Sequence, residues 1–416
     1  MHIVIVNRWP RFDDDPVRWD NELTRYEEFI DHHSHKVSYV VDTHGARGVA
    51  VEENLIAGYE LIDDVNDEQA LEQACHSIEH NHGKIDCLIA LSEFTLEIAA
   101  KVRLKLDIPG PKPDQVKWYR DKVYMKDAIR NSGLRVPEFI SADDPDLLNK
   151  VKDLSFPLIL KPRAGAASIG VKKISSSEEL VNSLSNINAA EYEIEEYIVG
   201  NIFHVDGYVN SLGDVVFQVV SEYVNDCLSF ALGQPLGSYT IDDQQILLAV
   251  EAYTVKCCQA LNLSASPFHL ELFWCQGEIV FLEIGARVGG AEVPHLINKI
   301  HDVNLYECWL RELSGDSLPP IPTKSNTQGG WLVYPKPEDA CYRVKSVNSL
   351  KDEIKAIWRE LTPFPGDELS PGGSYDALHC GRFIYVGDSS EQIKNSILNT
   401  IECFNCVLEP ANPLSA

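Results

Sequence analysis

The sequence lacks the features of several protein classes. No run of eighteen apolar residues occurs among its 416 residues, so no transmembrane helix is expected. Its first ten residues, MHIVIVNRWP, lack the long apolar core of a signal peptide and are typical of a first β-strand. Basic residues are outnumbered by acidic ones, 36 against 63, which gives a formal net charge of −27. We therefore expect no nucleic-acid partner, and anionic ligands must be bound by local positive sites or metal.

The cysteines form neither a disulfide framework nor a zinc motif. Eleven are scattered along the chain, and the single CxxC, Cys403 and Cys406, has no second pair or histidines at zinc spacing. We expect reduced thiols and a cytoplasmic location. His32, His33 and His35 lie between a helical pattern and a strand, where histidines are usually solvated.

The first part of the chain has the pattern of an α/β domain. Short strands rich in isoleucine and valine alternate with helical segments, which predicts a parallel sheet. Ligands approach such sheets at the carboxyl ends of the strands. Glu93 follows a strand, so it is either a ligand contact or an acidic residue in the first turn of a helix. The expected strands are 2–6, 36–41 and 85–91, and the expected helices lie near 20–31, 67–82 and 93–106.

Proline and glycine clusters predict the domain boundaries. IPGPKP ends the first domain, and SLPPIPTKSNTQGG precedes the last part. Residues 225–243 show no periodicity, which predicts a loop over the site, whereas 294–314 predict one helix. The expected parts are an N-terminal α/β domain, 1–113; a small unit with a glycine-rich loop, 114–190; a larger unit, 191–316; and a C-terminal lobe, 317–416.

The stretch 268–294 contains the strongest functional pattern. Aromatic and β-branched residues flank Gln276-Gly277, which predicts a β-hairpin. With a three-residue turn, Glu271 lies directly opposite Glu283 on one face. Alternation along the strands also assigns to that face His269, Phe273, Phe281, Gly285 and Arg287, and to the other face Leu270, Leu272, Trp274, Leu282 and Ile284.

Two opposed carboxylates repel each other, so the pair needs a cation. Oxygen ligands suit Mg²⁺ or Mn²⁺, and these cations usually bring phosphate oxygens with them. The alternative is a solvated hairpin face with two unrelated glutamates. A two-residue turn would also place Glu271 and Glu283 on opposite faces.

Candidate phosphate-binding and nucleotide-binding segments precede the hairpin. Lys161 ends a strand and is followed by a loop of small residues, 163–170, whose backbone N–H groups could surround phosphate oxygens. The loop has neither a GxxxxGK[ST] nor a GxGxxG pattern, and an ordinary hairpin turn is the alternative. Lys122 is a second candidate cation. Residues 195–198, Glu-Glu-Tyr-Ile, end a strand whose backbone could contact a planar base.

This order of motifs resembles that of the ATP-grasp ligases, and the resemblance covers almost the whole chain. It implies an α/β (α+β) ATP-grasp fold with an N-terminal parallel-sheet domain and a small C-terminal lobe. The matching motifs are Lys122 with Gly133-Leu134-Arg135-Val136-Pro137, Leu158-Ile159-Leu160-Lys161-Pro162, the loop Gly165–Gly170, Glu195-Glu196-Tyr197-Ile198, His269-Leu270-Glu271 and Glu283-Ile284-Gly285-Ala286-Arg287.

The sequence departs from the family pattern at two positions. Gly285 stands where an asparagine that also binds metal is common, and Ile202 stands where a glutamate near the ribose is common. The metal would then rest on Glu271, Glu283, water and phosphate, and His204 or Asp206 could take over the ribose contact.

The resemblance also implies site roles, with ATP and Mg²⁺ (or Mn²⁺) as cofactors. Phosphates would be held by Lys122, Lys161 and the loop residues Gly165, Ser168 and Gly170; adenine by Glu195, Glu196, Tyr197 and Ile198; ribose by His204; and metal by Glu271 and Glu283. Arg287 would stabilise the acyl phosphate and the later oxyanion. The substrates would contact Glu93, Gly289 and Gly290.

Within the superfamily, EIGARVGGAEVPHLI and CGRFIYVGDSSEQI look most like the L-amino acid ligases. These enzymes form dipeptides and related amides, often for small peptide antibiotics, and the resemblance implies a homodimer. The alternatives are a carboxylase or purine-pathway ligase of the same fold, which activates bicarbonate or formate, and a nucleotide-binding regulatory protein without turnover.

Overall fold

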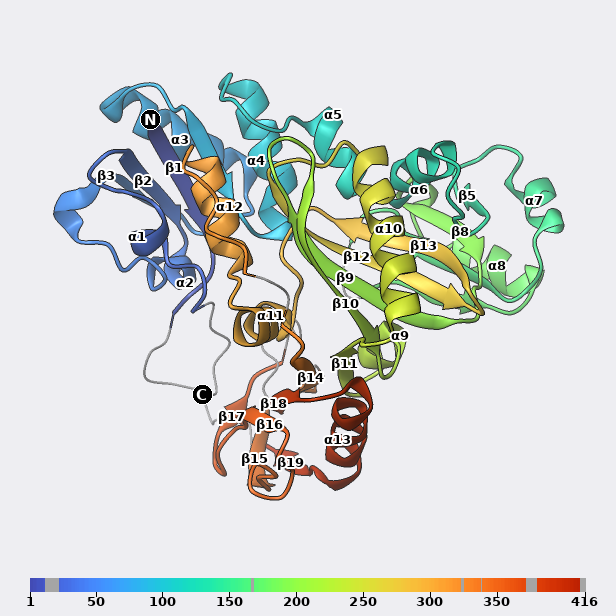
Figure 1. Cartoon of the computed structure of the whole chain (residues 1–416). Helices are drawn as coiled ribbons and strands as arrows, with labels where there is room; N and C mark the ends of the chain where they lie inside the picture. Colours follow the sequence, from blue (N-terminus) through green and yellow to red (C-terminus); the bar gives the residue numbers. More distant parts are fainter. Residues whose placement is uncertain (12–21, 166–167, 323–324, 338, 372–379, 412–416) are drawn as a thin grey trace.

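The computed structural model describes residues 1–11, 22–165, 168–322, 325–337, 339–371 and 380–411. An α/β part stands at one end, an eight-stranded sheet in the middle and a four-stranded antiparallel sheet at the other end (Figure 1). No helix in these ranges is both long and apolar enough to cross a membrane.

The N-terminal part is the expected parallel sheet, in the order β3-β2-β1-β4. The sequence did not predict β3, whose residues are mostly half-exposed or exposed and lack an apolar run. Ser92 caps α4, so Glu93 is its first helical residue, at the carboxyl end of β4. The elements are β1 (His2–Asn7), α1 (Tyr26–Phe29), β2 (Lys36–Val41), α2 (Thr43–Ala46), η1 (Glu53–Leu55), β3 (Ile56–Leu61), α3 (Glu68–His82), β4 (Cys87–Ala90) and α4 (Glu93–Lys105).

The next part forms the four-stranded sheet β5-β8-β6-β7. Helices α7 and α8 lie beside it at the outer end of the molecule (Figure 1). Its elements are α5 (Pro113–Val116), η2 (Lys117–Tyr119), α6 (Lys122–Asn131), β5 (Phe139–Ser141), α7 (Leu147–Lys150), η3 (Val151–Asp153), β6 (Leu158–Pro162), β7 (Lys172–Ile174), α8 (Ser177–Leu184), η4 (Ala189–Glu191) and β8 (Tyr192–Glu196).

The central sheet has the order β13-β12-β9-β10-β11-β14-β18-β16, and β17-β15-β19 forms a small sheet beside it. The elements are β9 (Asn201–Val209), β10 (Val215–Tyr223), α9 (Cys227–Ala231), β11 (Leu236–Thr240), α10 (Gln244–Ala260), β12 (Ser266–Cys275), β13 (Glu278–Gly285), α11 (Val293–His301), α12 (Leu305–Leu313), β14 (Gln328–Tyr334), β15 (Tyr342–Val347), β16 (Ile357–Leu361), β17 (Glu368–Leu369), β18 (Gly381–Gly387), α13 (Ser390–Cys403) and β19 (Cys406–Pro410).

Two expectations for this part are wrong. The predicted loop 225–243 contains α9 and the strand β11, which is buried along its whole length and therefore shows no alternation. The predicted helix 294–314 is two helices, because Asp302 has a left-handed backbone with φ of 54°. The domain boundaries remain a prediction. The boundary at residue 317 lies between α12 and β14, and β14 pairs with β11 in the central sheet.

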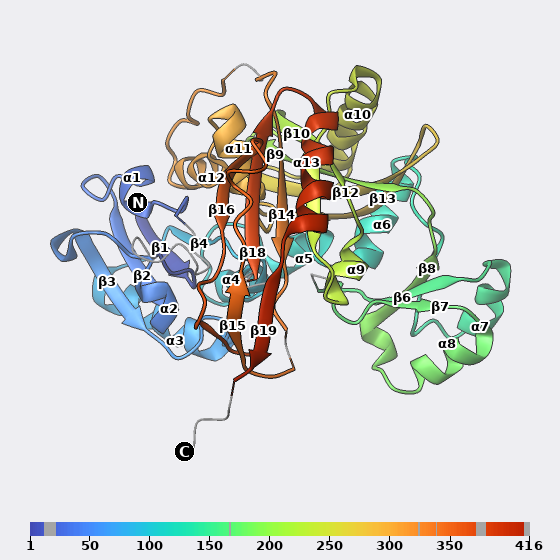
Figure 2. The same cartoon turned by 90° about the horizontal axis from the view of Figure 1, so that it is seen from below.

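Both faces of the central sheet are covered by helices. Helices α10 and α13 pack on one face, with Val250 and Ile397 in the same core cluster as Val205 of β9. Helices α11 and α12 pack on the other face, where Leu310 joins Tyr208. Figure 2 shows α13 lying along β14 and β18. The N-terminal part packs against α12, on the same side of the sheet.

Candidate active site

The candidate site is built around the hairpin of β12 and β13. Cys275 pairs with Glu278, so the turn contains only Gln276 and Gly277, which have φ values of 53° and 97°. Two positive φ values are typical of a two-residue type I′ turn. The predicted three-residue turn is therefore wrong.

A β-bulge nevertheless places the two glutamates opposite each other. Leu272 pairs with Phe281, whereas Glu271 pairs with Glu283, so Leu282 is an extra residue in β13. A bulge shifts the alternation of side chains by one residue. The predicted faces of Phe281 and Leu282 are consequently wrong, because Phe281 is buried in the core and Leu282 lines a cavity.

This cavity of about 450 Å³ is bounded by the hairpin, β6 and α9. Much of the predicted site meets here. The predicted residues that line it are Lys122, Lys161, Gly165, Ser168, Glu195, Glu196, Tyr197, Ile198, Glu271 and Glu283. The predicted residues that are not among its described lining residues are Gly170, His204, Arg287, Glu93, Gly289 and Gly290.

Lys122 is positioned by the N-terminus of α6. Asp121 caps the helix by accepting hydrogen bonds from its first backbone N–H groups, so Lys122 is the first helical residue. Its Nζ lies 3.0 Å from Glu283 Oε2 and 3.3 Å from the carbonyl oxygen of Gly165. Burial would raise the pKa of Glu283, but Lys122 and Lys161 outweigh it and lower this pKa to about 2. Glu283 is therefore ionised at neutral pH.

Lys161 belongs to a buried group of four charges, which we call the lysine–glutamate cluster. Lys161 Nζ lies 2.6 Å from Glu195 Oε1, while Lys126 Nζ lies 2.6 Å from Glu195 Oε2 and 2.8 Å from Glu193 Oε2. Burial alone would lower the pKa of Lys161, but the two carboxylates raise it. Lys126 and Glu193 were not predicted from the sequence. Lys126 follows Lys122 by one helical turn and Glu193 precedes Glu195 by two strand positions, so each shares a face with a predicted residue.

The glycine-rich loop has a left-handed backbone where the sequence places small residues. Gly165, Ser168 and Gly170 have φ values of 142°, 55° and 77°, and residues 166–167 lie outside the described part. A Cβ on Gly170 would come within 3.0 Å of the Pro162 ring. Glycine therefore allows the end of the loop to pack closely on β6.

Glu271 ends a buried row of polar side chains, which we call the histidine chain. His269 Nε2 lies 3.4 Å from Glu271 Oε1, and its Nδ1 lies 2.8 Å from Asp206 Oδ1. Asp206 Oδ2 lies 2.6 Å from His204 Nδ1, and His204 Nε2 lies 2.6 Å from Ser238 Oγ. Both ring nitrogens of His204 thus contact other members of the histidine chain. These members come from β9, β11 and β12.

The carboxylates and imidazoles of the histidine chain stabilise one another's charged forms. Burial would raise the pKa of Asp206, but His269 and His204 lower it below its usual value. Burial would lower the pKa of His269, but Asp206 and Glu271 raise it to about 9. Tyr223 donates a further hydrogen bond of 2.8 Å to Glu271 Oε1. Asp206 and His204 were predicted only as possible ribose contacts, and this arrangement was not predicted.

Arg287 and Glu93, predicted as parts of one site, lie in direct contact. Arg287 Nε is 2.6 Å from Glu93 Oε2, and Glu93 also accepts a hydrogen bond from Arg120. Burial would raise the pKa of Glu93, but Arg287 and Arg120 lower it. The backbone after Arg287 packs on Asp206, because a Cβ on Gly289 would lie 2.2 Å from Asp206 Oδ1.

The hairpin residues fit a hard divalent cation. Glu271 and Glu283 present carboxylate oxygens from paired positions on one face, and Mg²⁺ and Mn²⁺ accept such ligands. Lys122 at 3.0 Å offsets only part of this negative charge. The observed donor set therefore agrees with the predicted magnesium or manganese site.

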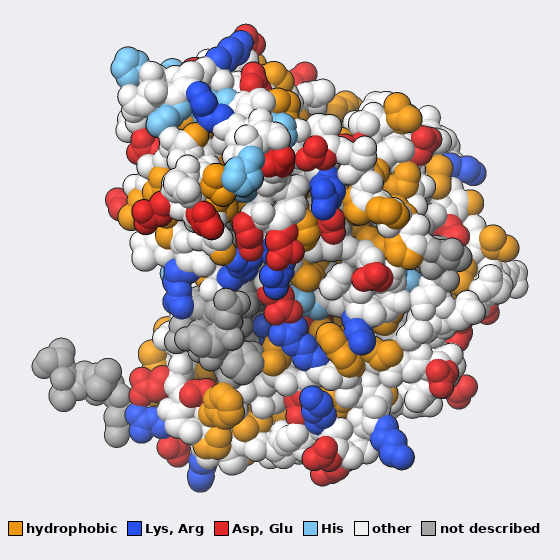
Figure 3. Space-filling view, turned by 60° about the vertical axis from the view of Figure 1, so that its left-hand side comes forward, with side chains coloured by type: hydrophobic (Ala, Val, Ile, Leu, Met, Phe, Trp, Pro, Cys, Tyr) orange, Lys and Arg blue, Asp and Glu red, His pale blue; other side chains and the backbone are white. Residues whose placement is uncertain are grey.

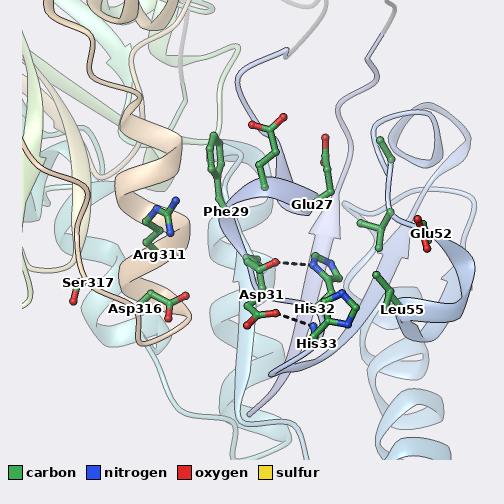
Figure 4. A pocket seen from close by; sticks show the side chains of 14 residues that line it. Glu27, Phe29, Asp31, His32, His33, Glu52, Leu55, Arg311, Asp316 and Ser317 are labelled. Carbon is green, nitrogen blue, oxygen red and sulfur yellow. Dashed lines mark hydrogen bonds between the residues drawn. The ribbon is translucent and has the colours of Figure 1, made fainter.

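A second cavity, of about 730 Å³, lies between the N-terminal part and the end of α12. Figure 4 shows Asp31 and His33 in contact at its wall, where Asp31 Oδ1 accepts a 2.9 Å hydrogen bond from the backbone N–H of His33. His32 is buried and its Nδ1 bonds the carbonyl of Ile30 at 2.7 Å. The expectation that these histidines are solvated is wrong for His32. Neither candidate lysine lines this cavity.

Local positive charge occurs despite the acidic composition. The face in Figure 3 carries lysine and arginine side chains that gather near its middle, although the whole chain has a net charge of −27. This distribution agrees with binding of anions by local sites rather than by the overall field.

Comparison with known proteins gives consistent relatives. The ATP-grasp domain family matches residues 154–295. The L-arginine-specific L-amino acid ligase of Bacillus subtilis is 22% identical over 258 residues, which cover 59% of this chain and 62% of that protein. A D-alanine--D-alanine ligase of Natranaerobius thermophilus is 28% identical over 196 residues, or 42% of this chain and 52% of that protein. The chain thus spans less than two thirds of the length of these relatives.

The fold as a whole is that of a solved ligase structure. The L-amino acid ligase of Bacillus licheniformis superposes with a TM-score of 0.72 at 17% identity, covering 98% of both chains. At this identity the likeness shows the fold alone. It confirms the expected α/β architecture with a parallel N-terminal sheet.

Proposed function

Because this chain carries an ATP-grasp domain within the ATP-grasp fold, we propose that it is an ATP-dependent carboxylate–amine ligase. It joins an amino acid or small carboxylic acid to an amino acid through an acyl phosphate and releases ADP and phosphate. One observation carries the proposal: Lys122, Lys161, Glu271 and Glu283 line a single cavity. The lysines offer fixed positive charge to phosphates, and the glutamates offer ligands to the accompanying cation.

In this proposal the nucleotide phosphates lie along the two lysines. Lys122 and Lys161 hold the α- and β-phosphates, and the loop residues Gly165, Ser168 and Gly170 contact the γ-phosphoryl group. Bound Mg²⁺ or Mn²⁺ would neutralise charge on the phosphate oxygens. Glu196, Tyr197 and Ile198 form the adenine side of the cavity. Exclusion of water from the occupied cavity protects the acyl phosphate from hydrolysis.

The chemical steps take place at the end of β13. The substrate carboxylate attacks the γ-phosphorus, and ADP leaves. The amine, after losing one proton from its ammonium form, then attacks the carbonyl carbon. A C–N bond forms, the C–O bond to phosphate breaks, phosphate leaves, and the second proton of the new amide nitrogen is released to solvent. Arg287 stabilises the negative charge of the acyl phosphate and of the tetrahedral oxyanion. Glu93 already contacts Arg287 at 2.6 Å, so an ammonium bound by Glu93 would lie beside the reacting carbonyl, near Gly289 and Gly290.

The proposal extends to the cellular setting. A cytoplasmic location agrees with eleven free cysteines, which are typical of a reducing compartment. A homodimer and a role in making small peptide antibiotics follow from the resemblance to amino-acid ligases. Light scattering would measure the first, and product identification would bear on the second.

The test is a matrix of paired carboxylates and amines, assayed with ATP and Mg²⁺ for phosphate release and product mass. A ligase releases phosphate only when both substrates are present, and the product mass equals the sum of both substrates minus water. Release that depends on bicarbonate or formate, without an amino acid, would instead indicate the carboxylase or purine-pathway alternative. No release with any pair would indicate a nucleotide-binding regulatory protein.

A further inference from the structure

His269 is placed beside the two candidate metal ligands. It stands two residues before Glu271 on β12 and directly opposite Gly285, while Glu271 stands opposite Glu283. The three side chains therefore share one face of the hairpin. His269 is only 8% exposed, and Gly285 opposite it contributes no side chain. The imidazole thus borders Glu271 on this side, together with the hydroxyl of Tyr223, which donates a 2.8 Å hydrogen bond to Glu271 Oε1.

The orientation of the ring is fixed by Asp206. Asp206 Oδ1 lies 2.8 Å from His269 Nδ1, and the other oxygen of Asp206 lies 2.6 Å from His204 Nδ1. A carboxylate is an acceptor, so His269 donates its Nδ1–H to Asp206. A histidine whose Nδ1–H is held by a carboxylate is the usual arrangement of a metal-binding imidazole. The remaining nitrogen, Nε2, faces Glu271.

The distance between His269 Nε2 and Glu271 Oε1 is close to the distance between two ligand atoms bound to one metal ion. The two atoms lie 3.4 Å apart. Both can carry a lone pair, so a proton or a cation must lie between them. Two neighbouring ligands at about 2.1 Å from one ion are separated by about 3 Å. A small closure of this gap would therefore let both atoms bind the same ion. Glu283 would join them by a movement of its side chain, because in the described part of the chain the ligand atoms of His269, Glu271 and Glu283 do not all lie within 4.8 Å of one another.

We propose that His269 Nε2 is a third protein ligand, with Glu271 and Glu283, of the divalent cation, and that it makes the site prefer Mn²⁺ to Mg²⁺. The inference rests on the proposed function, because that function requires the cation. Manganese accepts carboxylates as magnesium does, but it is also a first-row transition metal and so binds a nitrogen ligand better than magnesium, which takes oxygen ligands. Binding releases any proton on Nε2. Asp206 and His204 act as positioning residues.

The group His204, Asp206 and His269 could be taken for a separate metal site, since its ligand atoms lie within 4.8 Å of one another. The short contacts argue against this assignment. Asp206 uses both oxygens on the two Nδ1 atoms, and His204 Nε2 lies 2.6 Å from Ser238 Oγ. The hydrogen bonds of Asp206 and His204 thus fix the orientation of the His269 ring.

The decisive measurement is electron spin-echo spectroscopy of Mn²⁺ bound to the whole protein with a non-hydrolysable ATP analogue. We expect ¹⁴N modulation from a directly bound imidazole, replaced by the ¹⁵N pattern when histidine is labelled. His269→Gln should abolish the modulation and weaken Mn²⁺ binding at least about 10-fold, with a smaller loss for Mg²⁺. Asp206→Asn should weaken Mn²⁺ binding about 10-fold. The matched control, His32→Gln, alters a buried histidine of the N-terminal part and should leave the spectrum unchanged.

The outcomes separate this inference from the proposed function. Mn²⁺ that binds with the nucleotide analogue but shows no imidazole nitrogen overturns the role of His269 and leaves the ligase proposal intact. The role of His269 is likewise overturned if His269→Gln, folded by circular dichroism, keeps the wild-type spectrum. If wild-type protein binds no Mn²⁺ at all in the presence of the analogue, both proposals fail. The wild-type spectrum suffices even if the variants do not fold.

Discussion

Two buried polar clusters flank the candidate nucleotide cavity, and they balance their charges differently. In the lysine–glutamate cluster, Lys126 and Lys161 face Glu193 and Glu195 at distances down to 2.6 Å. Two cations meet two anions, so this cluster is complete within the protein. The histidine chain instead ends at Glu271, which adjoins a second carboxylate across the hairpin.

The difference assigns different tasks to the two clusters. Breaking a balanced buried group leaves an uncompensated charge, so its residues should matter first for stability. A group that needs an outside cation should matter first for binding and turnover. Variants on the two sides of the cavity can therefore separate a structural role from a functional one.

The largest effect, a loss of turnover, is expected at the hairpin glutamates Glu271 and Glu283, which need an outside cation. Glu283→Gln should lower turnover about 1000-fold or more, because a bound cation supplies several kcal/mol of charge stabilisation. The effect on the melting temperature should be smaller than the effect on turnover, because the lost contact with Lys122 is partly offset by relief of the repulsion with Glu271. Phosphate release and thermal denaturation measure the two quantities. The control is Glu278→Gln, which changes an exposed residue on the same strand. Near-normal turnover in Glu283→Gln would show that Glu283 is not a required metal ligand.

Substitutions in the lysine–glutamate cluster should lower the free energy of unfolding more than they lower turnover. Lys126 is fully buried, and Lys126→Met leaves Glu193 and Glu195 with Lys161 alone. We expect a loss of about 3–5 kcal/mol in the free energy of unfolding, measured by denaturant titration. The double variant Lys126→Met/Glu193→Gln removes one charge of each sign and should recover part of the loss. A double variant no more stable than Lys126→Met would contradict the charge-balance explanation.

The hairpin shows how far alternation alone could predict the site. Glu271 and Glu283 were expected to face each other, and they do, but through a two-residue turn and a bulge at Leu282. Beside the bulge, the backbone N–H of Phe281 donates a 3.0 Å hydrogen bond to the carbonyl of Arg135, outside the sheet. Local sequence gives no sign of this contact or of the bulge, so the pairing was right although the expected turn length was wrong.

The two clusters show the same limit. Lys161 and Glu195 were predicted because each belongs to a contiguous motif. Lys126 and Glu193 were not, since their role depends on a contact between α6 and β8 that no local pattern indicates. Likewise, the support behind His269 comes from β9 and β11, and β11 was predicted as a loop. Motifs predicted residues that line the cavity, such as Lys161 and Glu195, whereas contacts distant in sequence hold those residues in place.

The next prediction tests whether Arg287 belongs to the catalytic side. Arg287→Lys keeps the charge but loses the guanidinium geometry that contacts Glu93. We expect kcat to fall about 100-fold, with little change in KM for ATP, because Arg287 does not line the nucleotide cavity. Steady-state kinetics distinguishes the two constants. Arg311→Lys, on α12, is the matched control. A rise in KM for ATP without a change in kcat would place Arg287 in nucleotide binding instead.

The smallest effect belongs to a partly exposed ion pair, which provides a scale for both buried clusters. Glu22 lies 2.6 Å from Arg359 and 3.3 Å from His295, and its side chain is 35% exposed. His295 lowers the pKa of Glu22, although burial opposes it, and Arg359 lowers it further. A lowered folded-state pKa gives stability that is present above the unfolded value of about 4.3 and is lost as the pH falls.

Glu22→Gln should therefore cost less than about 1 kcal/mol at pH 7. Its difference from wild type should shrink progressively once the pH falls below about 4.3 and should vanish only when the pH passes the lowered folded-state pKa of Glu22. Thermal denaturation of both proteins from acid to neutral pH measures this gap. Glu28→Gln removes an exposed pair with Arg25 and should show almost no gap at any pH. A Glu22 gap that stays constant into acid would mean that packing, rather than charge, holds this residue. The partly exposed pair would then say nothing about how charge is balanced in the two buried clusters.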